Sequence, residues 1–172
     1  MTDLKKAIRD IPDFPKPGII FKDITPLLAD GELFRQTINQ LKTRYMNKKI
    51  DTVIGIEARG FIFASALAYA LGAGLVIIRK PRKLPYKTHR ETYALEYGTD
   101  AIEIHQDAVK PGQNVLLIDD VLATGGTVSA ALNLLNKNFK ASVEEVIFII
   151  ELDFLKGREK LKGVPVHSLI NY

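Results

Sequence analysis

Two adjacent carboxylates near the centre of the chain are the residues best suited to chemistry. Asp119 and Asp120 follow Val115–Ile118, an apolar run with the composition of a strand buried on both faces. We expect the acids where this strand emerges from its sheet. The alternative is that they only cap a helix, and it is the weaker one because two acids at the end of a buried strand are costly without a partner. The pair therefore predicts a ligand-binding site.

A glycine-rich segment follows the acids and suits an anion. It consists of Ala123, Thr124, Gly125, Gly126 and Thr127. The glycines let the backbone approach a ligand closely, and the helix expected over 128–139 begins with unpaired N–H groups and the positive end of its dipole. The threonine hydroxyls can add donors. Because carboxylates repel phosphate, the acids should face sugar hydroxyls or a phosphate-bound Mg²⁺, so the motif predicts a sugar phosphate.

Two other phosphate-binding motifs do not fit this segment. A P-loop requires Lys after its second glycine, but no Lys follows Gly126, and the dinucleotide fingerprint G-x-G-x-x-G is absent as well. The run from the apolar strand through Asp-Asp to Thr-Gly-Gly-Thr resembles instead the signature of type I phosphoribosyltransferases. The resemblance implies that 5-phosphoribosyl-1-pyrophosphate (PRPP) is the sugar donor, with its 5-phosphate on 123–127 and its ribose hydroxyls on Asp119 and Asp120.

Arg59 is a cation in an unusual place, at the start of a helix expected over Phe61–Leu71. A cation there opposes the helix dipole and needs an anion or an acid. Glu57 is the simplest partner. The resemblance implies instead that Arg59, with the backbone of Ala58 and Gly60, binds pyrophosphate, and that Arg59 and the two acids are catalytic. Members of the family often hold a cis peptide in this loop, a point that the sequence leaves open.

The densest positive charge lies between Arg79 and Lys83, where four of five residues are cationic. A solvated patch or one that faces nucleic acid is the alternative. The run begins where the strand expected over Gly74–Ile78 ends, and ligands of α/β proteins bind at such ends. Pyrophosphate binding by Arg79, Lys80 and Lys83 is therefore favoured. In the resembled family such residues can also reach the neighbouring subunit's site, and we expect a homodimer.

The segment 11–29 is apolar but contains four prolines, which predicts an irregular flap. By itself it could be a surface arm held by its aromatic residues. It resembles, however, the N-terminal hood of the adenine phosphoribosyltransferases within this family. That implies that Phe21 stacks on adenine and that Ile20, Lys22 and Val121 complete the base pocket. Lys22 stands where members usually carry Arg, so the contact survives only if the backbone makes it.

The segment of about 84–97 is polar and predicts a flexible loop that leads into a hairpin, with strands over Tyr93–Gly98 and Ala101–His105. Its Leu-Glu-Tyr-Gly end resembles the catalytic loop of the same family. The resemblance gives Glu96 a role in proton transfer or charge stabilisation. The alternative is an ordinary solvent-facing strand acid.

The order of the expected elements predicts the fold. Strands over 52–56, 74–78, 115–118, 143–151 and 166–170 alternate with helices, after a short N-terminal helix over Leu4–Ile11 and a longer one from Leu33 to Met46. A short helix is also expected over Phe154–Leu161. Such alternation favours an α/β fold, with a mostly parallel doubly wound sheet and helices on both faces. We expect a single domain over 1–172, the type I phosphoribosyltransferase fold.

Composition narrows the class of protein further. The 172 residues suffice for one domain with a core, and 47% hydrophobic and 26% charged residues are ordinary for a globular chain. The absence of Cys excludes disulfides and thiol catalysis, and with no signal-peptide pattern it favours a cytoplasmic protein. The net charge of +4 suits anionic substrates. We expect neither nucleic acid nor membrane as a partner, and no direct protein ligands to a metal.

The sequence thus predicts an enzyme that transfers phosphoribose from PRPP to adenine, with Mg²⁺ bound on PRPP or pyrophosphate. Two alternatives stay open. The first is specificity for another purine such as xanthine, hypoxanthine or guanine, which would point to a different hood. The second is a non-catalytic regulator that keeps the donor site and binds DNA. A helix-turn-helix extension would indicate the regulator, and the core elements leave no room for one in these 172 residues.

Overall fold

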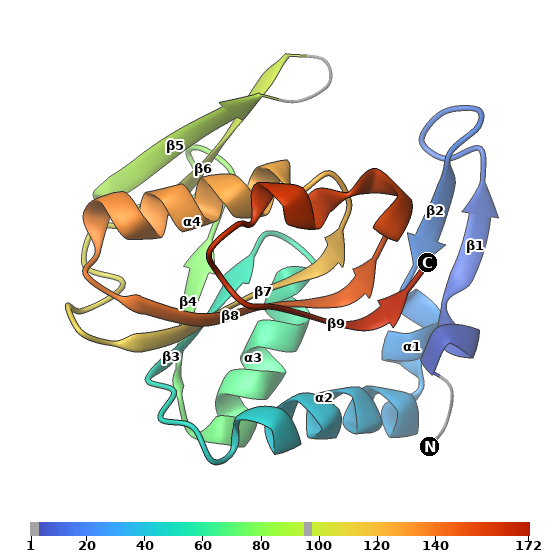
Figure 1. Ribbon diagram of the computed structural model, residues 1–172, viewed down its shortest axis with the longest axis horizontal. Helices are drawn as coiled ribbons and strands as arrows, with labels where there is room; N and C mark the ends of the chain where they lie inside the picture. The colour runs from blue at the N-terminus through green and yellow to red at the C-terminus, as the bar shows by residue number, and fades with distance from the viewer. Residues whose placement is uncertain (1–3, 95–97) are drawn as a thin grey trace. The chain divides into compact units, whose positions relative to one another are not determined.

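The computed structural model describes residues 4–94 and 98–172 (Figure 1). The chain divides into two compact units, Met1–Arg44 and Tyr45–Tyr172. Among the described residues, no helix is both long and apolar enough to cross a membrane.

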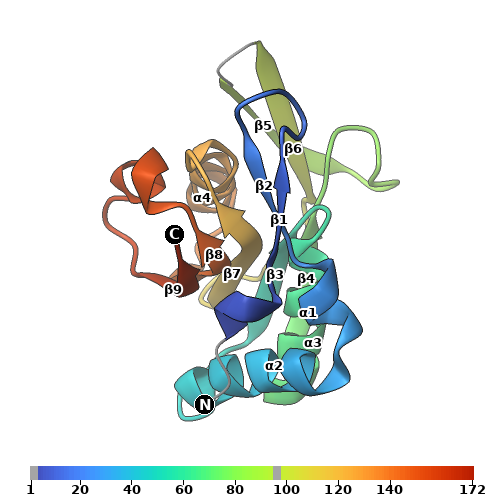
Figure 2. The same cartoon turned by 90° about the vertical axis from the view of Figure 1, so that its right-hand side faces the viewer.

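The N-terminal unit contains a hairpin where the sequence predicted a helix and an irregular flap (Figure 2). Its elements are a 3-10 turn η1 (Leu4–Ala7), strands β1 (Arg9–Pro12) and β2 (Ile20–Asp23), and helices α1 (Thr25–Ala29) and α2 (Gly31–Tyr45). The helix expected over Leu4–Ile11 is wrong, because β1 pairs antiparallel with β2 and Arg9 donates to the Asp23 carboxylate at 3.1 Å. A non-local pairing overrides the local pattern here. The expected second helix is confirmed, and the Asp30 carboxylate caps it by accepting from the N–H of Glu32 at 2.9 Å.

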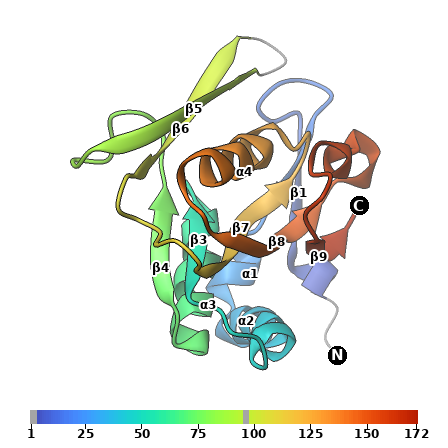
Figure 3. The ribbon, with the colours of Figure 1, turned by 60° about the vertical axis from the view of Figure 1, so that its left-hand side comes forward.

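The larger unit is built on a five-stranded sheet in the order β4-β3-β7-β8-β9, and all neighbouring strands are parallel. The strands are β3 (Thr52–Ile56), β4 (Gly74–Ile78), β7 (Asn114–Leu122), β8 (Ser142–Glu151) and β9 (Val166–Asn171). Helix α3 (Gly60–Leu71) covers one face and α4 (Gly126–Asn138) the other (Figure 3). The predicted α/β fold with a parallel, doubly wound sheet is therefore confirmed.

The central strand β7 shows why the sheet needs helices on both faces. Val115 and Leu117 pack in the core cluster that contains Leu132 and Leu135 of α4. Leu116 is also fully buried but points to the opposite face, as alternation along a strand requires. A strand buried on both sides has no polar face, and this explains its continuous apolar sequence.

A second hairpin extends from the sheet, formed by β5 (Thr88–Ala94) and β6 (Thr99–His105). It begins five residues earlier than the predicted strand at Tyr93, because the polar segment before it alternates in burial and pairs with β6. Ile102 and Ile104 anchor β6 in the core. At the other end of the chain, the helix expected over Phe154–Leu161 is instead two 3-10 turns, η2 (Asp153–Leu155) and η3 (Gly157–Lys160), separated by Lys156 in the left-handed region at φ 52°.

Candidate active site

Asp119 and Asp120 lie inside the end of β7 rather than beyond it. The strand continues because Val121 and Leu122 still pair with β8, opposite Ile150 and Glu151. Asp120 is 6% exposed, whereas part of Asp119 stays accessible to solvent. The Asp119 carboxylate accepts a hydrogen bond from the backbone N–H of Asp120 at 2.9 Å. The backbone positions of both acids are thus fixed by the pairing of β7 within the sheet.

Burial raises the pKa of the Asp119 carboxyl well above its usual range, and the charge of Asp120 beside it acts in the same direction. Burial also raises the pKa of Asp120, although the Arg59 guanidinium opposes the shift. Arg59 Nε is 2.7 Å from Asp120 Oδ2, so Asp120 is an acidic neighbour of Arg59. The contact is an ion pair without hydrogen-bond geometry, and Asp120 Oδ2 has no hydrogen-bond partner within the described residues.

The loop that carries Arg59 packs directly against the acids. The peptide between Glu57 and Ala58 is cis. A Cβ added at Gly60 would lie 2.8 Å from the carbonyl oxygen of Ile118 and 3.0 Å from Asp119 Oδ1. Only glycine therefore allows this approach between the loop and β7.

The glycine-rich segment is the turn between β7 and α4. Gly125 is the N-cap of α4 with φ +76°, a left-handed conformation that favours glycine. The segment lines an open hollow, together with Asp119, Val121, Leu122 and Val128. The segment includes the start of α4, where a helix has N–H groups without helical partners, which gives it the character of an anion site.

A support for this turn was missed at the sequence level. A Cβ added at Gly125 would lie 2.5 Å from the carbonyl oxygen of Gly157 in η3. Arg158 holds η3 by donating to both oxygens of Glu151, each at 2.6 Å. The signal was the Gly-Arg-Glu-Lys run, which reads as a helix unless its contact with a distant glycine is known.

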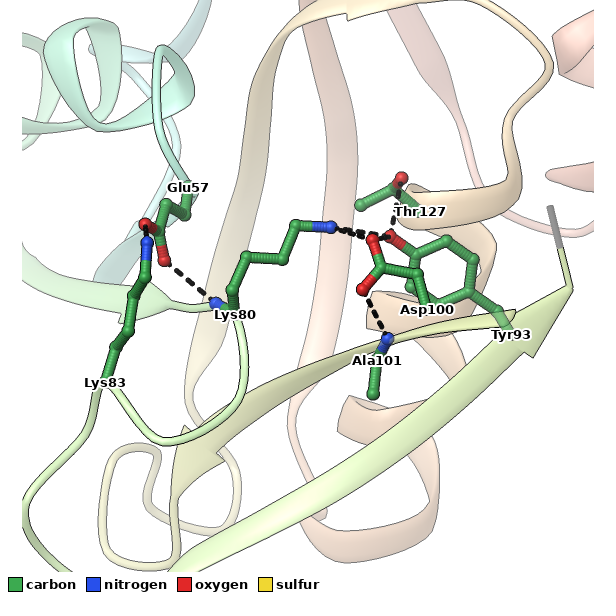
Figure 4. A network of polar contacts seen from close by, with 7 residues as sticks. All are labelled: Glu57, Lys80, Lys83, Tyr93, Asp100, Ala101 and Thr127. Carbon is green, nitrogen blue, oxygen red and sulfur yellow. Dashed lines mark hydrogen bonds and ion pairs between the residues drawn. The ribbon is translucent and has the colours of Figure 1, made fainter. Parts of the chain in front are cut away.

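Glu57 is the centre of one cationic cluster (Figure 4). Its carboxylate accepts from Arg79 Nε at 3.3 Å and from the backbone N–H of Lys80 at 2.8 Å, and it pairs with Lys83 Nζ. Burial acts to raise the pKa of Glu57, but these donors outweigh it and hold the pKa below its usual value. The run of cations is thus folded around an acid rather than spread into solvent.

Lys80 is held by a second cluster on the β5–β6 hairpin. Its Nζ lies 3.1 Å from the Tyr93 hydroxyl and pairs with the Asp100 carboxylate. Thr127 of the glycine-rich segment donates to the same Tyr93 hydroxyl at 3.2 Å. Tyr93 and Asp100 were not predicted as site residues, because only the strand register places them opposite each other.

The predicted site residues thus fall into three groups. The larger unit brings together those expected for the phosphate, ribose and pyrophosphate: Ala58, Arg59, Gly60, Arg79, Lys80, Lys83, Asp119, Asp120 and 123–127. Of the expected base contacts, Ile20, Phe21 and Lys22 lie on β2 of the N-terminal unit, whereas Val121 lies on β7 in the lining of the hollow. Glu96 lies outside the described residues.

Within the described residues, no group of three His, Cys, Asp or Glu side chains could hold a metal ion alone. Carboxylate oxygens are the ligands that Mg²⁺ prefers, but Asp120 Oδ2 is buried and lies 2.7 Å from Arg59 Nε. The site therefore fits an ion that takes its ligands chiefly from a bound phosphate and from water.

Comparison with known proteins assigns the chain to a family. The sequence pattern of the phosphoribosyl transferase domain matches residues 26–168. The chain belongs to the phosphoribosyltransferase family. Among curated phosphoribosyltransferases, an adenine phosphoribosyltransferase of Syntrophotalea carbinolica is 56% identical over 172 residues, which cover 100% of both chains. One from Chloroflexus aurantiacus is 56% identical and covers 99% of this chain and 98% of its own.

Solved phosphoribosyltransferase structures have the same fold as this chain. Adenine phosphoribosyltransferase from Thermoanaerobacter pseudethanolicus superposes with a TM-score of 0.94 at 50% identity, over 98% of each chain. The enzyme from Saccharomyces cerevisiae, solved with adenine and an imino-altritol bisphosphate, superposes with a TM-score of 0.91 at 43% identity, over 96% of each chain. The resemblance to adenine phosphoribosyltransferases is thereby confirmed.

Proposed function

We propose that this chain transfers the 5-phosphoribosyl group of PRPP to adenine, which yields AMP and pyrophosphate in purine salvage. The observation that carries the proposal is the full-length agreement with relatives of that name, at 56% and 53% identity over all 172 residues. The family pattern begins only at residue 26. The full-length matches include β1 and β2, where the predicted base contacts lie.

The sugar donor fits the larger unit by its chemistry. Residues 123–127 hold the 5-phosphate with N–H groups at the start of α4. Asp119 and Asp120 bind the ribose hydroxyls. The place of Asp119 supports this role, because Asp119 lines the hollow together with residues 123–127.

Pyrophosphate is assigned to Ala58, Arg59 and Gly60 and to the cations Arg79, Lys80 and Lys83. These cations are gathered at the ends of β3 and β4 by Glu57 and Asp100. Mg²⁺, bound with PRPP or pyrophosphate, would neutralise charge on the leaving group. Asp119, Asp120 and Glu96 would stabilise positive charge that develops on the sugar.

Adenine is assigned to Phe21, with Ile20, Lys22 and Val121. Phe14 packs edge-to-face against Phe21 at 5.2 Å between ring centres, which fixes the Phe21 ring. The Lys22 ammonium is paired with Asp10 at 2.7 Å. This favours a base contact through the Lys22 backbone rather than through its side chain.

The proposal includes one functional domain over 1–172, with a hood at 11–29. The flexible loop expected over about 84–97 is replaced over 88–94 by strand β5. It also includes a cytoplasmic location and a homodimer, as expected from the sequence. An apolar face supports the dimer. Tyr69 is 91% exposed, and Ile62 stands two turns before it on the same side of α3. Leu75 on the edge strand β4 is exposed as well.

A base-competition assay tests the activity. PRPP and Mg²⁺ are supplied with adenine, hypoxanthine, guanine or xanthine, and nucleotide and pyrophosphate are measured. AMP as the only nucleotide is the expected result. Product from another base would overturn the specificity, and PRPP binding without any product would favour a regulator.

A further inference from the structure

The two ends of the proposed donor site are joined by one cross-strand pair on the β5–β6 hairpin. Tyr93 and Asp100 are direct partners across the two strands. Lys80 belongs to the cations that follow β4, and Thr127 to the segment at the start of α4. Figure 4 shows both side chains reaching the Tyr93–Asp100 pair.

The protons in this cluster can be assigned from the chemistry of the groups. An ionised carboxylate only accepts, so the single proton of Tyr93 goes to Asp100 at 3.2 Å. The Tyr93 oxygen must then accept from Thr127 at 3.2 Å and from Lys80 at 3.1 Å. The hydroxyl of Thr127 has one proton, which Tyr93 uses. A phosphate oxygen, which also only accepts, would need that same proton.

The positive charge of Lys80 is also paired within this cluster. Its ammonium pairs with the Asp100 carboxylate, and the two side chains are 36% and 30% exposed. Burial acts to lower the pKa of Lys80, but Asp100 and Tyr93 outweigh it and leave the pKa raised. The hydrogen bond from Lys80 lowers the pKa of Asp100. Both groups are therefore ionised at neutral pH, and an incoming anion meets a partly neutralised lysine.

We propose that Tyr93 and Asp100 compete with the sugar donor for Lys80 and Thr127, and thereby lower the affinity of the protein for PRPP and pyrophosphate. They are positioning residues, since they act through Lys80 and Thr127 rather than on the reacting atoms. The inference rests on the proposed assignment of these two residues to the donor. A pair that only orients Lys80 and Thr127 for the donor would have the opposite effect on affinity.

Calorimetric titration separates the two cases. With Mg²⁺ present, Asp100→Asn is expected to lower the Kd for pyrophosphate by about two- to fivefold, as for loss of a half-exposed ion pair. Tyr93→Phe keeps the net charge and is expected to lower the Kd for ribose 5-phosphate by a similar factor of about two to five. The KM for PRPP should fall in both variants. An unchanged or higher Kd in both variants would overturn the proposal.

Two controls separate competition from a general effect of charge. Glu91→Gln removes one negative charge from the same hairpin, where Glu91 pairs with Lys137 at 2.8 Å, and it should leave both Kd values unchanged. In a Lys80→Met background, Asp100→Asn should no longer tighten pyrophosphate binding. A gain that persists there would show that Lys80 is not the competing partner and would overturn its role.

The titrations use no base, so they do not depend on the proposed acceptor. Wild-type protein that forms AMP but shows no gain in these variants would disprove the competition and leave the function in place. Wild-type protein that forms no nucleotide, while the variants still bind pyrophosphate more tightly, would disprove the function and leave the competition.

Discussion

At the residue scale, β7 holds two neighbouring acids that are largely shielded from water, an arrangement that folded proteins usually avoid. Asp119 and Asp120 are adjacent and enclosed, and burial raises the pKa of both carboxyls. The nearby guanidinium of Arg59 offsets only part of this for Asp120. An ionised pair in such a place destabilises the fold, so its presence is best explained by a ligand.

Asp119→Asn is expected to stabilise the fold by about 1 kcal/mol at pH 7, because it removes a buried charge and its repulsion with Asp120. The amide oxygen can still accept from the Asp120 N–H. The sign of the pH dependence follows from the raised pKa. At this site the folded wild type binds more protons than the unfolded chain, so the contribution of Asp119 to stability rises as pH falls toward the ordinary value of 3.8. In urea denaturation at pH 4 to about 7, the gain in stability of the variant over the wild type should therefore shrink as pH falls.

The exposed acid Asp107 provides the matched control for that experiment. Asp107→Asn should change the free energy of unfolding by less than about 0.5 kcal/mol. A loss of stability in Asp119→Asn would mean that the carboxylate contributes to the fold rather than to a ligand.

Asp120→Asn is expected to lower kcat by about 10- to 100-fold, because a carboxylate paired with Arg59 is replaced by a neutral group near the developing charge. The fold should remain intact by circular dichroism. Steady-state kinetics with PRPP and adenine provide the measurement. Unchanged kinetics would remove the ribose role from Asp120.

At the element scale, the turn between β7 and α4 owes its shape to a distant segment. The Glu151–Arg158 pair fixes η3 against β8, and the backbone of Gly157 then supports the turn at Gly125. Burial acts to raise the pKa of Glu151, but Arg158 and Ser168 outweigh it and the pKa is lowered. The contribution of this pair to stability is therefore present above the usual carboxyl pKa and is lost as pH falls through the lowered one.

Gly157→Ala is expected to raise the KM for PRPP by about tenfold or more, because a Cβ there would collide with the carbonyl oxygen of Ala123 and displace the phosphate segment. Kinetics with varied PRPP measure the effect. Gly31→Ala is the control, since a Cβ at Gly31 meets no atom within 4 Å. Equal KM values in both variants would show that η3 does not position the segment.

The elements that the sequence predicted well are those that bury a regular apolar pattern. β3, α3 and β8 appear within a residue of their expected bounds, because their burial is decided by neighbouring residues in the chain. The bounds of β4 also match, although only its last residue is buried. The errors occur where a long-range contact decides. β1 forms only through its pairing with β2, and the early start of β5 depends on β6.

The site residues divide in the same way, into those that local sequence predicts and those that depend on long-range contacts. Residues 119–127 and Arg59 could be predicted as site residues from the local composition and from their position at the ends of expected strands. Tyr93, Asp100 and Gly157 do not, because their importance arises from strand register or from a backbone contact. Neither quantity can be derived from spacing along the chain.

At the scale of the whole molecule, the apolar face of the larger unit is the feature that a single chain leaves exposed. Ile62 and Tyr69 are exposed on α3, which packs against β4, and Leu75 of β4 is 45% exposed at the edge of the sheet. An uncovered edge strand with exposed apolar residues favours aggregation unless a partner covers it. A second copy of the chain would do so, as the proposed homodimer requires.

Tyr69→Asp is expected to shift the protein from dimer to monomer, because a charge at the centre of an apolar interface has no partner. Sedimentation velocity at several protein concentrations measures the change. Phe154→Asp is the matched control, because Phe154 is 70% exposed but lies outside this face, in η2. If Tyr69→Asp and Phe154→Asp both sediment like a dimeric wild type, the dimer uses another surface. If the wild type itself is monomeric, the homodimer is wrong, and the exposed face of α3 and β4 needs another explanation.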